Sequence, residues 1–229
     1  MSSVINKGYC ESISIIDIGS NSLRYAVYDM QEAFLLLPKF NEKVFCGLAR
    51  DLNASSELSY KSCRLVLTTV QRFVQIAKFY GSKDIGIFAT SAIRDAKNGL
   101  KFASEISKSV KIPVEILSEE EEGKYGAVGV LSSISNVEGI VADLGGGSLE
   151  LSNVKGQSVG TTKSLSLGSL RLEHYGENKE EMIEKSLAKV KSSFKDYEGL
   201  NLYGVGGGFR LLAKLHMSHI DYPLNLVHN

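Results

Sequence analysis

One short motif occurs twice in this chain of 229 residues. Residues 16–23 read IDIGSNSL and residues 142–149 read ADLGGGSL, so that Asp, Gly and Ser recur 126 positions further along. Repeats of short period build stacked arrays, whereas a period of domain size that occurs twice favours a duplicated domain. Each copy runs from an apolar segment through an acid and a glycine-containing turn into a second apolar segment. The sequence therefore predicts two related halves, each built around a strand–turn–strand unit.

The remaining pattern alternates between strands and helices. Period-two alternation predicts the opening strands 12–18 and 23–30 and a third at 33–39, and helical spacing predicts a long helix over 59–80 that Gly81 ends. Further strands are expected at 84–89, 114–117, 139–144, 149–153, 161–165 and 200–205, and further helices at 98–110, 118–132, 169–175, 179–194 and 210–217. Strands first, then strands alternating with helices, indicate the α/β class.

Composition and charge exclude several classes of function. The 26 basic and 26 acidic residues cancel, which removes the electrostatic argument for general nucleic-acid or membrane-surface binding. Cys10, Cys46 and Cys63 are an odd number without metal-ligand spacing and fit a reducing compartment. No segment approaches the ~20 apolar residues of a membrane span, and no secretory signal is recognised. We expect a soluble, cytoplasmic protein with no membrane contact.

The two turns have the chemistry of an anion site. Glycines allow backbone N–H groups to approach an anion, and a serine hydroxyl adds a donor. An acid at the end of a buried strand is costly unless it meets a cation or a donor, and Mg²⁺ bridged to phosphates is a natural occupant. Two ordinary hairpin turns are the alternative, which the repetition of the motif disfavours. The candidate phosphate-binding residues are Gly19, Ser20, Asn21, Ser22, Gly145, Gly146, Gly147 and Ser148.

Five segments in order carry a resemblance to a known family. They are IDIGSNS from Ile16, ATSAIRD from Ala89, EEGKY from Glu121, VADLGGGSLEL from Val141 and GVGGGFR from Gly204. Each is weak alone, but together they are specific and cover nearly the whole chain. The chain resembles the exopolyphosphatase/guanosine pentaphosphate phosphohydrolase (Ppx/GppA) family of the actin/hexokinase/Hsp70 superfamily.

The resemblance implies a particular architecture. We expect an α/β protein of two actin-like (ribonuclease H-like) domains, at 1–124 and 125–229, with the site in the cleft between them. Members of the family continue well past the last glycine-rich loop, so the second domain is expected to be incomplete relative to them.

The acidic run after Ser118 holds the candidate general base. Ser118 with Glu121 three residues later forms a capping box, and acids in a first helical turn favour the helix dipole. Capping and the dipole account for Glu119, Glu120 and Glu121 and leave Glu122 without a structural task. Glu122 also aligns with the family's catalytic base, and a neighbouring carboxylate is expected to raise its pKa.

The resemblance assigns the remaining site residues. Arg94 and Ser91 correspond to phosphate-binding positions, and a guanidinium fork suits phosphoryl oxygens. Asp143 and Glu150 resemble the acids that hold the metal, and Asp17 occupies the equivalent place in the first copy. A surface Arg94 and a solvent-facing Glu150 are the alternatives. His216, His219 and His228 are expected to be surface histidines, because no acid lies at ligand spacing from them.

The resulting hypothesis is a phosphohydrolase. Glu122 and Arg94 would be catalytic, with Mg²⁺ as cofactor, and the substrate would be inorganic polyphosphate or guanosine pentaphosphate. A homodimer is compatible with the sequence. An actin-like ATPase or small-molecule kinase, and a non-catalytic alarmone or nucleotide sensor, are the alternatives. The absence of a clear acceptor-activating Asp disfavours the kinase, and the intact Glu122 disfavours the sensor.

Overall fold

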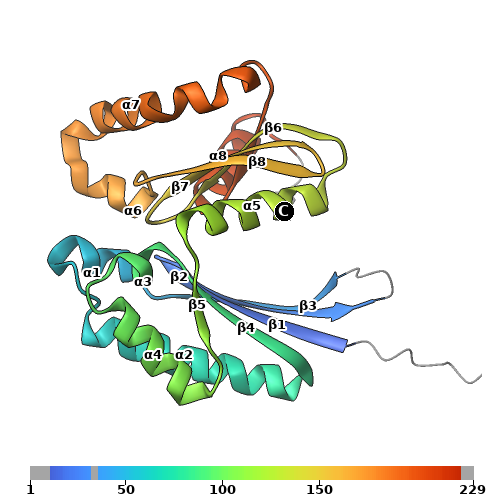
Figure 1. Cartoon of the computed structure of the whole chain (residues 1–229), viewed down its shortest axis with the longest axis vertical. Helices are drawn as coiled ribbons and strands as arrows, with labels where there is room; N and C mark the ends of the chain where they lie inside the picture. The colour runs from blue at the N-terminus through green and yellow to red at the C-terminus, as the bar shows by residue number, and fades with distance from the viewer. Residues whose placement is uncertain (1–10, 32–35, 223–229) are drawn as a thin grey trace, which may run out of the picture. The chain divides into compact units, whose positions relative to one another are not determined.

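The structure, a computed structural model, describes residues 11–31 and 36–222. Contacts divide the chain into two compact units, Met1–Ile116 and Leu117–Asn229. This division precedes the boundary expected after Lys124, because the whole of helix α5 (Glu119–Ser133) packs against the strands of the second unit. Figure 1 shows the elements of both units.

The first unit is a five-stranded sheet with helices packed against it (Figure 1). Its strand order is β3-β2-β1-β4-β5, with β1 antiparallel to β2 and parallel to β4. The strands are β1 (Glu11–Ile18), β2 (Ser22–Met30), β3 (Leu36–Phe45), β4 (Ser82–Ala89) and β5 (Val114–Ile116). The helices are α1 (Leu48–Ser55), α2 (Tyr60–Phe79), α3 (Ser91–Asp95) and α4 (Gly99–Val110).

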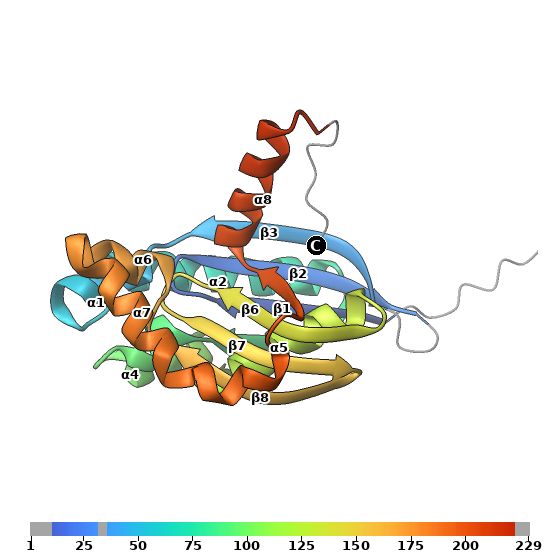
Figure 2. The same ribbon diagram turned by 90° about the horizontal axis from the view of Figure 1, so that it is seen from above.

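The second unit repeats this plan with four strands in the order β8-β7-β6-β9. The strands are β6 (Val137–Leu144), β7 (Leu149–Gly156), β8 (Ser158–Leu165) and β9 (Asn201–Val205). Besides α5, its helices are α6 (Ser169–Leu172), α7 (Lys179–Val190) and α8 (Gly207–His219), with 3₁₀ segments at Glu173–Asn178 and Lys191–Tyr197. Figure 2 shows α8 following directly from β9; α8 has no buried residue.

The repeated motif has the same backbone structure in both units. Asp17 lies opposite Arg24 in the β1–β2 ladder, and Asp143 lies opposite Glu150 at the same register of the β6–β7 ladder. The Gly19 amide donates to the Ser22 carbonyl at 3.1 Å, and the Gly145 amide donates to the Ser148 carbonyl at 3.0 Å. With the shared strand order, these contacts confirm the duplication predicted from the sequence.

Packing against the first sheet explains the long helix α2. Its N-cap Ser59 accepts from the Ser62 amide, and its buried face includes Val66, Val70 and Phe73 at helical spacing. The ring of Phe73 stacks on Tyr25 of β2 with centroids 4.9 Å apart. This core fixes β1 and β2, and therefore the turn between them.

The expected elements are confirmed with some differences. Helices α1 and α3 were not expected, because eight and five residues are too short to show a clear period. The third strand is Leu36–Phe45 rather than 33–39, of which 33–35 lie outside the described residues. The helices expected at 169–175 and 179–194 end earlier, at Leu172 and Val190, and each continues into a 3₁₀ segment, the first of which contains Gly176 with φ of +53°. Among the described residues, no helix combines the length and apolarity that a membrane crossing requires.

Candidate functional site

The glycine-rich turn of the second unit is fixed from behind by the start of α6. The amides of Ser169 and Leu170 donate to the carbonyls of Gly145 and Gly146, both at 3.0 Å. A Cβ on Gly168 would overlap the backbone of the turn at Gly147 and Ser148. The carbonyls of Gly145 and Gly146 therefore face α6, an arrangement that suits amide donation to an anion on the other side.

The hydroxyl of Ser148 lies beneath this turn. The residue is 4% exposed, and its Oγ meets no partner at hydrogen-bonding geometry among the described residues. Its hydroxyl is nevertheless close enough to Glu150 to oppose the rise in that carboxyl's pKa described below. A buried hydroxyl without a full set of partners is costly unless a ligand or water supplies one, which fits a phosphate-binding turn.

The acids in the first turn of α5 make different contacts. The Ser118 Oγ accepts from the Glu121 amide at 3.2 Å, and Glu121 Oε2 accepts from the Ser118 amide at 2.9 Å, so the expected capping box is present. Glu120 pairs with Lys124 at 2.6 Å. Glu122 is half-buried, takes no part in the cap, and lies close enough to Glu150 to influence its pKa.

Glu150 is the carboxyl whose pKa is most clearly raised. It is 2% exposed, and burial raises its pKa to about 7, with further increases from the charges of Glu122 and then Asp143. The nearby Ser148 hydroxyl opposes this shift, as does a hydrogen bond from Ser164, whose Oγ donates to Glu150 Oε1 at 2.9 Å. The alternative of a solvent-facing Glu150 is therefore wrong. A raised pKa of Glu122 itself stays a prediction.

Asp143 lies between two glycines from distant parts of the unit. A Cβ on Gly126 of α5 would lie 3.2 Å from Asp143 Oδ2. A Cβ on Gly206, which has φ of +98° before α8, would lie 3.0 Å from Asp143 Oδ1. The carboxylate therefore sits in a cradle that side chains at either position would fill.

This arrangement fits Mg²⁺ at Asp143. No cluster of three His, Cys, Asp or Glu that could hold a metal is found within the described part of the chain. Mg²⁺ does not require one, since it is commonly held by one or two carboxylates with waters and phosphate oxygens. The half-buried Asp143 is one such carboxylate, and Glu150 lies opposite it in the β6–β7 ladder.

The first unit holds the other predicted residues. Ser20 and Ser91 are buried, and their Oγ atoms lie 2.6 Å apart. The carbonyl of Asn21 accepts from the amides of Cys46 and Gly47 at 2.9 and 3.0 Å. These bonds hold the turn against the segment that directly follows β3. Asp17 contributes to a raised pKa of the Cys46 thiol, after burial as the main cause, so its carboxylate lies near that side chain.

Arg94 belongs to α3, directly after β4. Its side chain is 17% exposed, so the alternative of a surface arginine is not supported. The Arg94 Nε lies 3.7 Å from Asp95 Oδ1. The Ser20–Ser91 contact connects the start of this helix to the turn that follows β1.

The structure gathers the candidates into one group in each unit. The second unit brings together Glu122, Asp143, Glu150 and the turn Gly145, Gly146, Gly147 and Ser148. The first brings together the turn Gly19, Ser20, Asn21 and Ser22 with Ser91, while Asp17 and Arg94 lie on the elements that flank it.

Sequence reasoning missed Gly126 and Gly168 as parts of the site. It treated Gly206 only as part of a glycine-rich loop. The contacts that define all three are between segments far apart in the chain, and only the loop sequence GVGGG drew attention to any of them.

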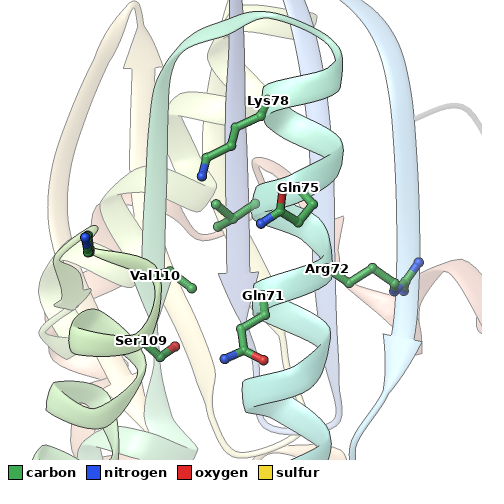
Figure 3. Close-up of a pocket in the computed structure, with 8 residues that line it drawn as sticks. Gln71, Arg72, Gln75, Lys78, Ser109 and Val110 are labelled. Carbon is green, nitrogen blue, oxygen red and sulfur yellow. The ribbon is translucent and has the colours of Figure 1, made fainter.

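A separate pocket of about 500 Å³ lies between α2 and α4 in the first unit (Figure 3). Lys78, Lys111, Gln71, Gln75 and Ser109 are among its lining residues, and none of the predicted site residues lines it. Both lysines are at helix C-termini, where cations are favoured by the helix dipole without any ligand. We therefore assign it no function.

Two of the histidines near the end of the chain, His216 and His219, lie on α8. His216 and His219 are exposed in the last turn of α8, as expected of surface histidines. His228 lies outside the described residues.

Comparison with known proteins gives one family. The profile of the Ppx/GppA phosphatase family matches residues 26–229. A protein named exopolyphosphatase 1 from Mycobacterium tuberculosis (strain ATCC 25618 / H37Rv) is 28% identical over 162 residues, covering 70% of this chain and 47% of that protein. Retrograde regulation protein 2 from Saccharomyces cerevisiae is 27% identical, in an alignment that covers 99% of this chain and 43% of that protein. The chain thus spans about half the length of the curated relatives it matches.

Solved structures agree on the fold. An exopolyphosphatase from Cytophaga hutchinsonii superposes with a TM-score of 0.84 at 22% identity, over 93% of this chain and 72% of that one. The Ppx/GppA family member from Aquifex aeolicus gives a TM-score of 0.74 at 25% identity, over 93% and 71%. The predicted α/β fold of two actin-like domains is confirmed.

Proposed function

Since this chain belongs to the Ppx/GppA phosphatase family, we propose that it is a phosphohydrolase that removes the terminal phosphate from inorganic polyphosphate or guanosine pentaphosphate. The observation that carries the proposal is the position of Glu122. It follows the capping box directly, takes no part in it, and lies beside the buried Glu150 in the unit that holds the glycine-rich turn.

The proposed reaction is an in-line attack of water on the terminal phosphorus. Glu122 accepts a proton from the water, a new P–O bond forms, and the bond from phosphorus to the bridging oxygen breaks. The shortened chain or nucleotide leaves with the bridging oxygen. Amides of the turn that follow Gly145, whose own amide donates to the Ser148 carbonyl, would bind phosphoryl oxygens and stabilise the charge that develops on them. Arg94 and the turn from Gly19 to Ser22 are likewise proposed to bind phosphoryl oxygens.

Mg²⁺ is proposed as the cofactor, with Asp143 as its main protein ligand. When bound, it would neutralise phosphate charge close to the carboxylates. Gly126 and Gly206 lie on two sides of the Asp143 carboxylate, where an added side chain would crowd it. Glu150 would support the metal site through its negative charge, with its side chain held by the hydrogen bond from Ser164.

The test is phosphate release from polyphosphate, guanosine pentaphosphate and ATP, each with Mg²⁺ and with excess EDTA. Release from polyphosphate or guanosine pentaphosphate, with ATP much slower, supports the proposal. ATP turnover that depends on an added acceptor would instead indicate the kinase alternative.

A regulatory, non-catalytic role is the second candidate. The matching relative named as a regulation protein aligns with 99% of this chain, which is more than the mycobacterial exopolyphosphatase covers. This candidate predicts saturable binding of a phosphorylated ligand without release of phosphate. Calorimetry beside the release assay distinguishes the two.

A further inference from the structure

Helix α5 contacts the strands of its own sheet through glycines. Gly123 and Gly126 are three residues apart, so they share one face of the helix. A Cβ on Gly123 would overlap Thr162 Cγ2 and would lie 3.2 Å from Glu150 Cβ. One turn further along, Gly126 faces the carboxylate of Asp143. The helix therefore lies directly on Asp143 and Glu150 of the β6–β7 ladder.

A hydrogen-bond chain holds this contact in place. The Ser152 Oγ donates to the Gly123 carbonyl at 3.2 Å and lies 2.9 Å from Thr162 Oγ1. Glu122 precedes Gly123, so the backbone that carries the proposed base is tied to β7 and β8 at its next residue. The close approach determines where Glu122 lies relative to Glu150 and Asp143.

We propose that Gly123 and Gly126 are positioning residues of the site. Gly123 sets the depth at which the start of α5 lies on the sheet, and thereby the position of Glu122. Gly126 sets the position of the Asp143 carboxylate, which is held between this glycine and Gly206. The measurements of phosphate release that test this inference rest on the proposed function. The measurement of metal binding does not, because it requires no turnover.

The same helix provides a matched control. Gly129 also lies on α5, and a Cβ there would have no atom within 4 Å. Alanine in place of a helical glycine stabilises a helix by about 0.5–1 kcal/mol when the space is free. Gly129→Ala therefore reports the propensity effect alone, and Gly126→Ala adds the contact with Asp143.

The first experiment measures Mn²⁺ binding by electron paramagnetic resonance, together with the Mg²⁺ concentration for half-maximal phosphate release. Gly126→Ala is expected to raise the Mn²⁺ dissociation constant and the half-maximal Mg²⁺ concentration, each by roughly 3- to 10-fold. The effect is smaller than the roughly 100-fold loss typical of a 1 Å displacement, because the added Cβ shifts the carboxylate by only a few tenths of an ångström. Its Tm should not fall, and Gly129→Ala should change neither metal value. Equal effects in the two variants, or none in Gly126→Ala, would overturn the role of Gly126.

The second experiment uses rescue at Gly123. Gly123→Ala is expected to lower kcat at saturating Mg²⁺ by about 10-fold or more. Thr162→Ser removes the methyl group that the new Cβ would overlap but keeps the hydroxyl bonded to Ser152, so Gly123→Ala/Thr162→Ser should recover most of the loss. A double variant no better than Gly123→Ala would sink the positioning role.

These outcomes separate the inference from the proposed function. If the wild type binds Mn²⁺ but releases no phosphate, the hydrolase proposal fails, and the metal readout still decides the role of Gly126. If the wild type binds no Mn²⁺, the role of Gly126 toward the metal fails, while metal-independent release would leave hydrolysis intact.

Discussion

The hydroxyl oxygens of Ser20 and Ser91 lie 2.6 Å apart in a buried contact between the first turn and the start of α3. The two residues are 5% and 3% exposed. Both were expected to bind phosphate directly, and their burial favours a different task, which is to hold the turn against the helix that carries Arg94. A direct role in binding stays untested.

Replacing Ser91 tests this contact. Ser91→Ala should lower the free energy of unfolding by about 1–3 kcal/mol, because it leaves the buried Ser20 hydroxyl without its partner. Urea unfolding measures the loss, and Ser22→Ala, at a less buried position, is the control. A stability loss no larger than that of Ser22→Ala would contradict the structural role.

The proposed base can be tested by an isosteric change. Glu122→Gln keeps the shape of the side chain but accepts no proton, so kcat should fall by ~10²–10⁴ while Tm is nearly unchanged. Glu120→Gln, at an exposed residue paired with Lys124, is the control and should keep its activity. Full turnover in Glu122→Gln together with loss in Glu121→Gln would move the base to the neighbouring residue.

Glu150 should make stability depend on pH. Burial raises its folded-state pKa to about 7, above the unfolded value near 4.5, so the folded state binds the proton more tightly. The resulting stabilisation is complete below about pH 4.5 and is lost as pH rises towards 7. Glu150→Gln cannot ionise and should therefore exceed the wild type in stability by about 2–3 kcal/mol at pH 8, with little difference between them at pH 4.5.

Chemical denaturation at the two pH values measures this difference. Thr68→Ala, at an exposed hydroxyl in α2, is a control whose effect should not vary with pH. A Glu150→Gln variant whose stability falls with pH in parallel with the wild type would show that the proton is held elsewhere.

Metal dependence should centre on Asp143. Asp143→Ala should raise the Mg²⁺ concentration for half-maximal activity by 10-fold or more, on the order of the loss typical of altered metal-site residues. Asp17→Ala, at the equivalent register of the first unit, should have a weaker effect. Phosphate release that persists undiminished in excess EDTA would refute the metal proposal and leave Arg94 as the main positive charge.

Much of this protein is determined by local sequence. The turn motif fixed two equivalent hairpins, because glycine-rich turns and alternating strands depend on residues close together in the chain. The Ser118–Glu121 capping box is equally local, and it leaves Glu122 outside the cap. The strand order that the two sheets share agrees with the duplication that the repeated motif predicted.

Other features depend on contacts between distant segments, and only the tertiary structure decided them. Glu150 and Arg24 occupy equivalent places in the two ladders, yet Glu150 is buried and Arg24 is exposed. The difference arises because α5 lies on the second ladder through its glycines, which removes water from Glu150 and raises its pKa. The position of Asp143 between Gly126 and Gly206 likewise joins residues that no local pattern relates. Burial and close approach are properties of the packed unit. They depend on contacts between distant segments, so a local pattern in the sequence does not reveal them.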